Sequence, residues 1–204
     1  NRQGHDVEAA AGEFVIRGQL PAHKYDSACL YLVPMEGPHP RPVDSAFVAE
    51  DGTFEFRGNV EQVAVLRLER MRRIGIQELL VVTEPGVTSV LLDSISSSKG
   101  TPQNEALQQW KEHLDTFRYE SRRIAEMRKE LGPNSDEYQA AFEAYRLAEG
   151  EYNYHFLKAL GRQTVSVFLN KMFTGNIDSL RRAELNELLA DTIDYTKPQP
   201  GFRR

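Results

Sequence analysis

Residues 87–117 read VTSVLLDSISSSKGTPQNEALQQWKEHLDTF, and the spacing of apolar residues changes within this stretch. Before Gly100 the apolar residues fall in a short run between turn-forming residues, which is typical of a strand. After it, apolar residues recur three or four positions apart, the period of an α-helix, at Leu107, Trp110, Leu114 and Phe117. Thr101 suits the N-cap of that helix and Pro102 its first position. The stretch therefore joins a β-rich N-terminal half to a helical C-terminal half.

The helical pattern continues to Leu131 and stops at Gly132-Pro133, which predicts a helix over residues 102–131. A second apolar seam follows, made of Tyr138, Ala141, Tyr145, Ala148, Tyr152 and Ala159. Two long helices joined by a short turn must lie antiparallel, as a helical hairpin with Trp110 and these tyrosines in its core. Residues 163–173 and 179–191 predict two shorter helices.

Residues 13–93 contain short apolar alternations separated by turn signals. Asp51-Gly52 is a strong turn dipeptide, and Glu84-Pro85-Gly86 suits a turn between two further strands. About seven strands are expected, near residues 14–18, 27–33, 43–49, 53–56, 62–69, 76–83 and 87–92. Because no helical stretch interrupts them, they predict an antiparallel β-sandwich rather than a parallel sheet. The predicted fold class is α+β.

The domain organisation follows from these patterns. Residues 1–12 are small, polar and aperiodic and predict a flexible tether, and residues 197–204 predict a Pro-rich tail. Between them we expect a β-sandwich domain over residues 13–98 and a helical domain over residues 99–196, with the boundary in the Ser-rich stretch at 94–101.

The composition excludes several classes of protein. The 204 residues carry a net charge of −5, whereas a general nucleic-acid binder normally has a basic surplus. No apolar run approaches the ~20 residues of a membrane span. The chain has one cysteine, so it has no internal disulfide and no CxxC pair, and none of the common nucleotide, zinc-protease or hydrolase motifs occurs. We therefore expect no enzyme activity, no cofactor and no metal.

Three features are candidates for a site, and each has a structural alternative. Cys29 lies mid-strand among apolar neighbours, so a packing role is favoured over a reactive thiol. Residues 67–73, RLERMRR, form the most basic run, which is either an anion or partner patch or a solvated turn. Residues 34–42 are Pro-rich and stiff. The candidate binding residues are Arg70, Arg72, Arg73, His39 and Arg41, with the arginine run preferred.

The ordered set of turns and strands resembles a known family. It comprises Phe14-Val15-Ile16-Arg17-Gly18, Leu30-Tyr31-Leu32, residues 51–58, Glu84-Pro85-Gly86, residues 90–93 and residues 100–104. In this order it is similar to a domain of unknown function from the envelope of anaerobic Gram-negative bacteria. That domain commonly precedes a thioredoxin-like module in thiol–disulfide oxidoreductases. The helices resemble the segment that follows it there.

The resemblance implies where the protein is located and with which kind of module it is associated. It implies an exported protein, in the periplasm or anchored to the outer membrane through a lipidated Cys upstream of Asn1. It transfers no catalytic residue, because the matching motifs are turns and caps. We therefore expect a non-catalytic envelope module that binds an unknown protein partner or small ligand and no nucleic acid. Two alternatives remain open: an accessory or N-terminal portion of a thioredoxin-like disulfide oxidoreductase system, and an enzyme whose site assembles through space.

Overall fold

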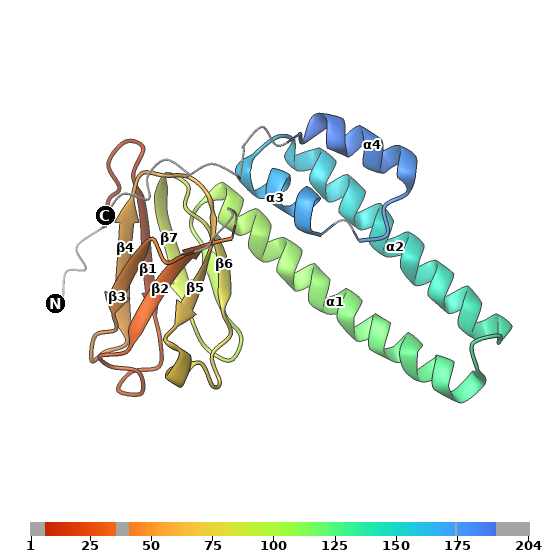
Figure 1. Cartoon of the computed structure of the whole chain (residues 1–204), viewed down its shortest axis with the longest axis horizontal. Coiled ribbons are helices and arrows are strands. Elements are labelled where there is room, and N and C mark those ends of the chain that lie inside the picture. The colour runs from red at the N-terminus through yellow and green to blue at the C-terminus, as the bar shows by residue number, and fades with distance from the viewer. Residues whose placement is uncertain (1–6, 36–40, 174, 191–204) are drawn as a thin grey trace. The chain divides into compact units, whose positions relative to one another are not determined.

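The computed structural model describes residues 7–35, 41–173 and 175–190. The predicted tail at 197–204, half of the predicted tether and His39 lie outside these residues. The described strands form two four-stranded sheets, and the helices follow them along the chain (Figure 1). The α+β class and the sandwich are therefore confirmed.

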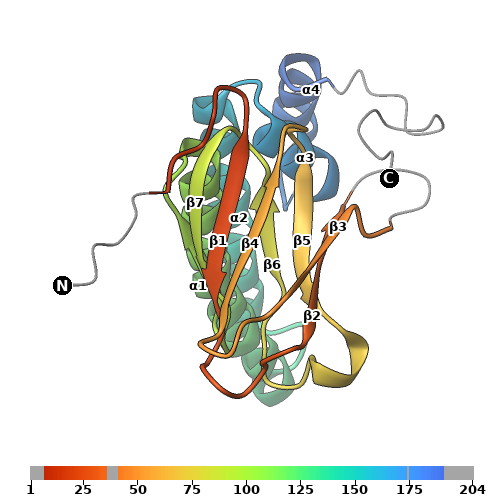
Figure 2. The ribbon, with the colours of Figure 1, turned by 90° about the vertical axis from the view of Figure 1, so that its left-hand side faces the viewer.

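The first sheet has the order β4-β1-β7-β8 and the second β3-β2-β5-β6; Figure 2 shows β4, β1 and β7 side by side. The strands are β1 Phe14–Gln19, β2 Cys29–Pro34, β3 Asp44–Phe47, β4 Thr53–Gly58, β5 Val63–Leu68, β6 Leu79–Val82, β7 Gly86–Leu91 and β8 Ser97–Lys99. One face of each sheet is apolar and packs into a shared core that includes Ile16, Leu30, Phe56 and Leu66. This is the alternation that the sequence shows along each strand.

Two details differ from the antiparallel sandwich of about seven strands that the sequence predicts. β8, in the Ser-rich stretch, is an additional strand that pairs with β7. β1 and β7 are parallel, whereas the other five strand pairs of the described residues are antiparallel. The reason is that Glu84-Pro85-Gly86 does not close a hairpin: it carries the chain from β6 in one sheet to β7 in the other.

The strand directions place four connections at one end of the sandwich. β1 and β7 run parallel, and β3 and β5 are both antiparallel to β2, which starts where β1 ends. β1, β3, β5 and β7 therefore all finish at the same end, which is the lower end of the sandwich in Figure 1. We call this the loop end; it consists of residues 20–28, 48–52, 69–78 and 92–96, and includes the short 3-10 helix η1, Arg70–Arg72. Helix α1 begins at the opposite end.

Helix α1, Pro102–Leu131, is tied to the sandwich through the buried amide of Asn104. Its Nδ2 donates to the carbonyl of Val82 and its Oδ1 accepts the N–H of Val82, both at 2.8 Å. The same Nδ2 lies 2.8 Å from the Thr101 hydroxyl and 3.1 Å from that of Thr88. Asn104 thus takes the place of a neighbouring strand at this edge position of β6.

The start of α1 is capped by a different side chain from the one that the sequence predicts. The Thr101 hydroxyl, predicted to cap the helix, bonds to Asn104 and Thr88. The N–H of Gln103 instead donates to both carboxylate oxygens of Glu84, at 3.0 Å each. Glu84 is buried, and burial raises the pKa of its carboxyl despite this hydrogen bond.

That raised pKa gives a pH-dependent prediction. The folded state favours the protonated carboxyl, so the contribution of Glu84 to the free energy of unfolding is greatest below its unfolded pKa of about 4.3 and is lost as pH rises through the folded value. The wild type should therefore lose stability relative to Glu84→Gln between about pH 4 and pH 7. Urea unfolding across this range measures the difference. Exposed Glu126→Gln is the control, and a Glu84→Gln difference as flat as the control's would contradict the prediction.

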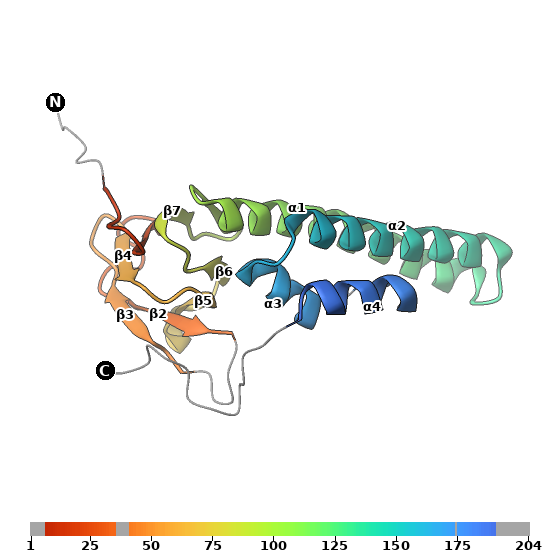
Figure 3. The same cartoon turned by 90° about the horizontal axis from the view of Figure 1, so that it is seen from above.

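The chain divides into two compact units inside α1, between Gln108 and Gln109. The predicted boundary at 94–101 stays a prediction. The second unit contains the rest of α1 with α2 Asp136–Leu160, α3 Thr164–Met172 and α4 Ser179–Leu188, and α3 and α4 lie alongside α2 (Figure 3). The bounds of α1 match the predicted helix.

The hairpin core forms only in part as the two seams predict, because Ala148 and Ala159 of the second seam are exposed. The residues of α2 that are buried lie on another face of the helix: Gly150, Asn153, Tyr154 and Leu157. Tyr145 and Tyr152 pack edge-on against Phe117, and Tyr152 stacks on His113 with ring centroids 3.6 Å apart. The end of the first seam differs, because Leu131 is exposed. Helix α2 is capped by Ser135, whose hydroxyl accepts the N–H of Tyr138.

Gly150 in α2 gives a second prediction, because the loop at Asn176 crosses the helix there. A Cβ at Gly150 would lie 2.1 Å from the Asn176 carbonyl oxygen. Gly150→Ala should therefore lower stability by roughly 1–3 kcal/mol, although the same change at an open helix position stabilises. Thermal melts test this, with Ala144→Gly, exposed in the same helix, as the control that should cost about 1 kcal/mol. A rise in melting temperature for Gly150→Ala would show that the loop does not pack there.

Candidate functional site

The exposed apolar side chains of the sandwich gather at the loop end. Among the described residues up to Gln108, five large apolar side chains are exposed: Phe47 (75%), Met71 (92%), Ile74 (89%), Leu91 (48%) and Ile95 (76%). Phe47 and Leu91 end β3 and β7, Met71 lies in η1, and Ile74 and Ile95 lie in the connections that follow β5 and β7. All five are therefore at the same end of the sandwich, and we call them the apolar loop cluster.

Hydrogen bonds hold these connections together. The N–H of Gln77 donates to the carbonyl of Asp93, and the Gln77 side chain accepts the N–H of Ser96, both at 2.8 Å. The Tyr25 hydroxyl lies 3.4 Å from the carbonyl oxygen of Ile74. These bonds join three connections that are far apart in the sequence, so the cluster is carried on a fixed support.

The arginine run that the sequence singles out lies beside the cluster, and most of its charge is balanced locally. Arg67 pairs with Glu78 at 2.8 Å, Arg72 with Glu69 at 3.4 Å and Arg73 with Glu78 at 3.8 Å. Arg70 is exposed and has no partner among the residues that the structure describes. The run is thus less of an anion site than its sequence suggests.

The other predicted binding stretch lies elsewhere. Pro34 ends β2 and Arg41 precedes β3, and both lie at the end of the sandwich where α1 begins, away from the loop end. Arg41 is exposed there, whereas His39 falls outside the described residues. The structure therefore separates Arg41 from Arg70, Arg72 and Arg73.

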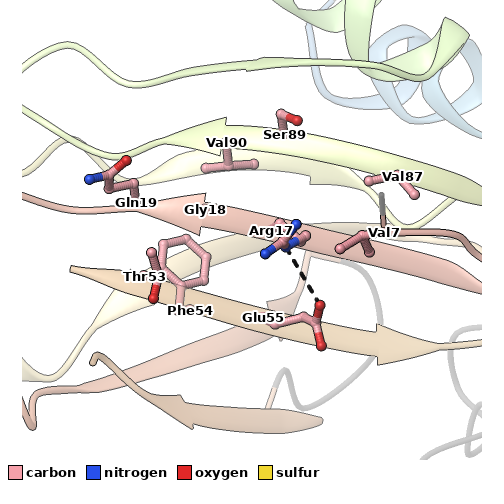
Figure 4. A pocket seen from close by; sticks show the side chains of 10 residues that line it. All are labelled: Val7, Arg17, Gly18, Gln19, Thr53, Phe54, Glu55, Val87, Ser89 and Val90. Atoms are coloured by element: carbon pink, nitrogen blue, oxygen red, sulfur yellow. Dashed lines mark ion pairs between the residues drawn. The ribbon is translucent and has the colours of Figure 1, made fainter. Parts of the chain in front are cut away.

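A shallow groove of about 630 Å³ runs over the first sheet. Figure 4 shows Arg17 of β1 and Glu55 of β4 directed toward each other across it, with an ion pair of 3.7 Å. Ser89 and Val7 also line it. Among the described residues that line the groove, the charged side chains are Arg17 and Glu55, which neutralise one another. The groove is also open, so it does not enclose a ligand as a typical small-molecule pocket does.

The titratable groups of the described residues matter for two kinds of site, a metal site and an acid–base pair. In the described part of the chain, no group of three or more His, Cys, Asp or Glu side chains could hold a metal ion, and no helix could cross a membrane. Burial lowers the pKa of Lys111 to about 8, and its Nζ has no hydrogen-bond partner in that part. The charged groups that affect this pKa, Glu112 and Asp115, lie on the same helix as Lys111. They therefore do not bring a catalytic partner to Lys111 from another element.

Cys29 is the first residue of β2 and not in the middle of a strand as predicted, and its side chain is half-buried. Its side chain neighbours Tyr31, whose pKa is raised chiefly by a hydrogen bond with Cys29. Since disulfide exchange usually needs an attacking thiolate and a resolving thiol, we expect insulin reduction with dithiothreitol to stay at background. Activity above background that is lost in Cys29→Ala would contradict this.

The sequence does contain a signal for the cluster, although its residues are not part of the apolar periods that predict the strands and helices. Met71 and Ile74 lie inside a predicted turn, and Ile95 inside a Ser-rich stretch, where large apolar residues have no core to enter. Their meeting at one end could not be read from the sequence, because it depends on the strand directions.

Comparison with known proteins gives one finding on this chain. No curated protein and no solved structure matches it significantly. The region that does match a family contains the eight strands and the first turn of α1. The match of this region confirms the resemblance to a domain of unknown function. The association with a thioredoxin-like module stays a prediction. Residues 14–107 match the family model described as Domain of unknown function (DUF4369).

Proposed function

We propose that the protein is a non-catalytic binding module of the cell envelope, and that it docks to its partner through the apolar loop cluster. The observation that carries this proposal is the gathering of all five exposed large apolar side chains of the described sandwich at the loop end. The envelope location rests on the resemblance of the sandwich to an envelope domain.

The distribution of these side chains matters more than their number. Single exposed apolar residues scattered over a surface are normal and need no explanation. Here Met71 and Ile74, the two most exposed, occupy one short connection, and hydrogen bonds through Gln77 bring Ile95 close to it. Apolar side chains held in water on fixed loops are typical of a surface that is covered when a partner binds.

The test compares two triple variants of the full chain as bait. Met71→Ser/Ile74→Ser/Ile95→Ser removes the most exposed part of the cluster, and Tyr119→Ser/Leu147→Ser/Leu180→Ser removes three apolar side chains from the helices that are each more than half exposed. Both should keep the wild-type melting temperature, because the changed side chains are exposed.

Soluble and membrane fractions of envelope extract are then passed over each bait. We expect the loop variant to lose the material that the wild type retains, whether protein or lipid, and the helix variant to keep it. Equal retention by the loop variant and the wild type, with both folded, would refute docking through the cluster.

A further inference from the structure

We propose that the turn between β3 and β4 is a site of backbone modification, in which Asp51 converts to isoaspartate, and that the Thr53 hydroxyl suppresses this conversion in the folded protein. The turn contains Asp51-Gly52, the only Asp-Gly step in the sequence. The proposal does not depend on what binds at the loop end, because it concerns a reaction of the chain with itself and with water.

The reaction uses groups that the turn itself supplies. The backbone nitrogen of Gly52 attacks Cγ of the protonated Asp51 carboxyl and forms a C–N bond. The carboxyl hydroxyl leaves as water with the proton of the N–H, and a succinimide ring remains. Water then opens the ring at either carbonyl carbon, which restores aspartate or gives isoaspartate. Glycine favours the attack because it has no side chain to keep the carboxyl away from its nitrogen.

The carboxyl is held in its unreactive form in the folded turn. Oδ1 of Asp51 accepts the Thr53 hydroxyl at 2.7 Å and the Thr53 N–H at 3.1 Å. These hydrogen bonds lower the pKa of the Asp51 carboxyl, and the hydroxyl is the larger cause. Since the reaction expels a hydroxyl from the protonated carboxyl, a carboxyl that is kept ionised reacts slowly.

The nitrogen that would attack is also held in place. The N–H of Gly52 donates to the carbonyl of Ala49 at 2.9 Å, and the carbonyl of Gly52 accepts the N–H of Leu20 at 2.8 Å. The φ of Gly52 is +86°, and a Cβ there would lie 2.1 Å from the Leu20 carbonyl oxygen. The peptide units on both sides of Gly52 are therefore fixed, and the attack requires this end of the sandwich to open locally.

Conversion would damage the support of the loop end. Isoaspartate carries the backbone through the side chain and so adds one methylene to the chain just before β4 begins. Two backbone hydrogen bonds are made across this point, from Leu20 to Gly52 and from Ala49 to Thr53. Neither keeps its geometry when the chain between Ala49 and Thr53 is lengthened, so suppression of the reaction preserves this part of the sandwich.

The Thr53 hydroxyl is the restraint that a substitution can remove with the least disturbance. Thr53 is exposed and is the first residue of β4. Valine has nearly the same shape as threonine and suits a strand, but it has no hydroxyl. Serine keeps the hydroxyl, so Thr53→Ser is the matched control for Thr53→Val.

The experiment incubates the full chain at neutral pH below its melting temperature and measures isoaspartate at position 51 by enzymatic methylation and peptide mapping. The folded wild type and Thr53→Ser should accumulate it slowly. Folded Thr53→Val should accumulate it roughly threefold faster or more, because the hydrogen bond to the carboxylate is lost. The wild type unfolded in guanidinium chloride should accumulate it at least roughly tenfold faster than the folded protein, because the turn is then open.

A thermal melt of each variant shows whether it is folded during the assay. If Thr53→Val is not, Thr53→Ala removes the hydroxyl with a smaller side chain and takes its place. Asp51→Glu, which would have to form a larger ring, should give no signal at this position. Conversion in a folded variant without the hydroxyl that is no faster than in the wild type would overturn the proposal. Equal conversion in the folded and the unfolded wild type would overturn it too, as would an unfolded chain without isoaspartate at position 51.

Discussion

Replacing Asn104 by alanine should destabilise the sandwich by roughly 2–6 kcal/mol, one of the two largest effects that we expect of any single change. The side chain is fully buried and satisfies both the N–H and the carbonyl of Val82, which is itself fully buried. Alanine would leave both backbone groups without a partner, and each such group costs about 1–3 kcal/mol. Urea unfolding followed by circular dichroism measures the loss.

Two further variants identify the cause. Asn104→Asp keeps the shape but removes both donors and places a carboxylate oxygen against the carbonyl of Val82, so it should be at least as damaging. Gln109→Ala, an exposed change in the same helix, should have little effect. A loss below about 1 kcal/mol for Asn104→Ala would mean that the edge of β6 does not depend on this amide.

Replacing Trp110 by alanine should cost about 3–5 kcal/mol in the helical unit. The indole is 4% exposed, and its ring packs against Phe173 with centroids 5.0 Å apart. The change removes a large apolar surface and leaves a cavity, so the melting temperature should fall by many degrees.

The matched control for Trp110 is Tyr119→Ala, which removes an aromatic ring that is 71% exposed on the same helix. It should leave the melting temperature nearly unchanged. Equal melting temperatures for Trp110→Ala and the wild type would show that the indole is not part of the core.

Local patterns predict the helices well and the sandwich less completely. Helix α1 follows from a single apolar period with a proline at its start and a Gly-Pro at its end, all of which are short-range signals. Such short-range signals cannot predict which strands lie beside β7, because its parallel pairing with β1 joins residues far apart in the chain. β8 is also missed, because serines carry no apolar alternation and the strand exists through its pairing with β7.

The candidate site shows the same division. The sequence identifies Arg70, Arg72 and Arg73 as a basic run, but the ion pairs of Arg72 with Glu69 and of Arg73 with Glu78 depend on how the connection folds. It also marks residues 34–42 as stiff, yet only the strand arrangement shows that Arg41 lies at the other end of the sandwich. The apolar loop cluster required the three-dimensional arrangement, because its members come from three connections.

The claim that docking occurs at the loop end, and not at the Pro-rich end, is tested most directly by photo-crosslinking in cells. p-Benzoylphenylalanine replaces either Met71 or Arg41, both exposed and at opposite ends of the sandwich. After irradiation, adducts with lipid or protein are scored by mass. We predict adducts from position 71 and none above background from position 41; adducts from position 41 with none from position 71 would contradict the account.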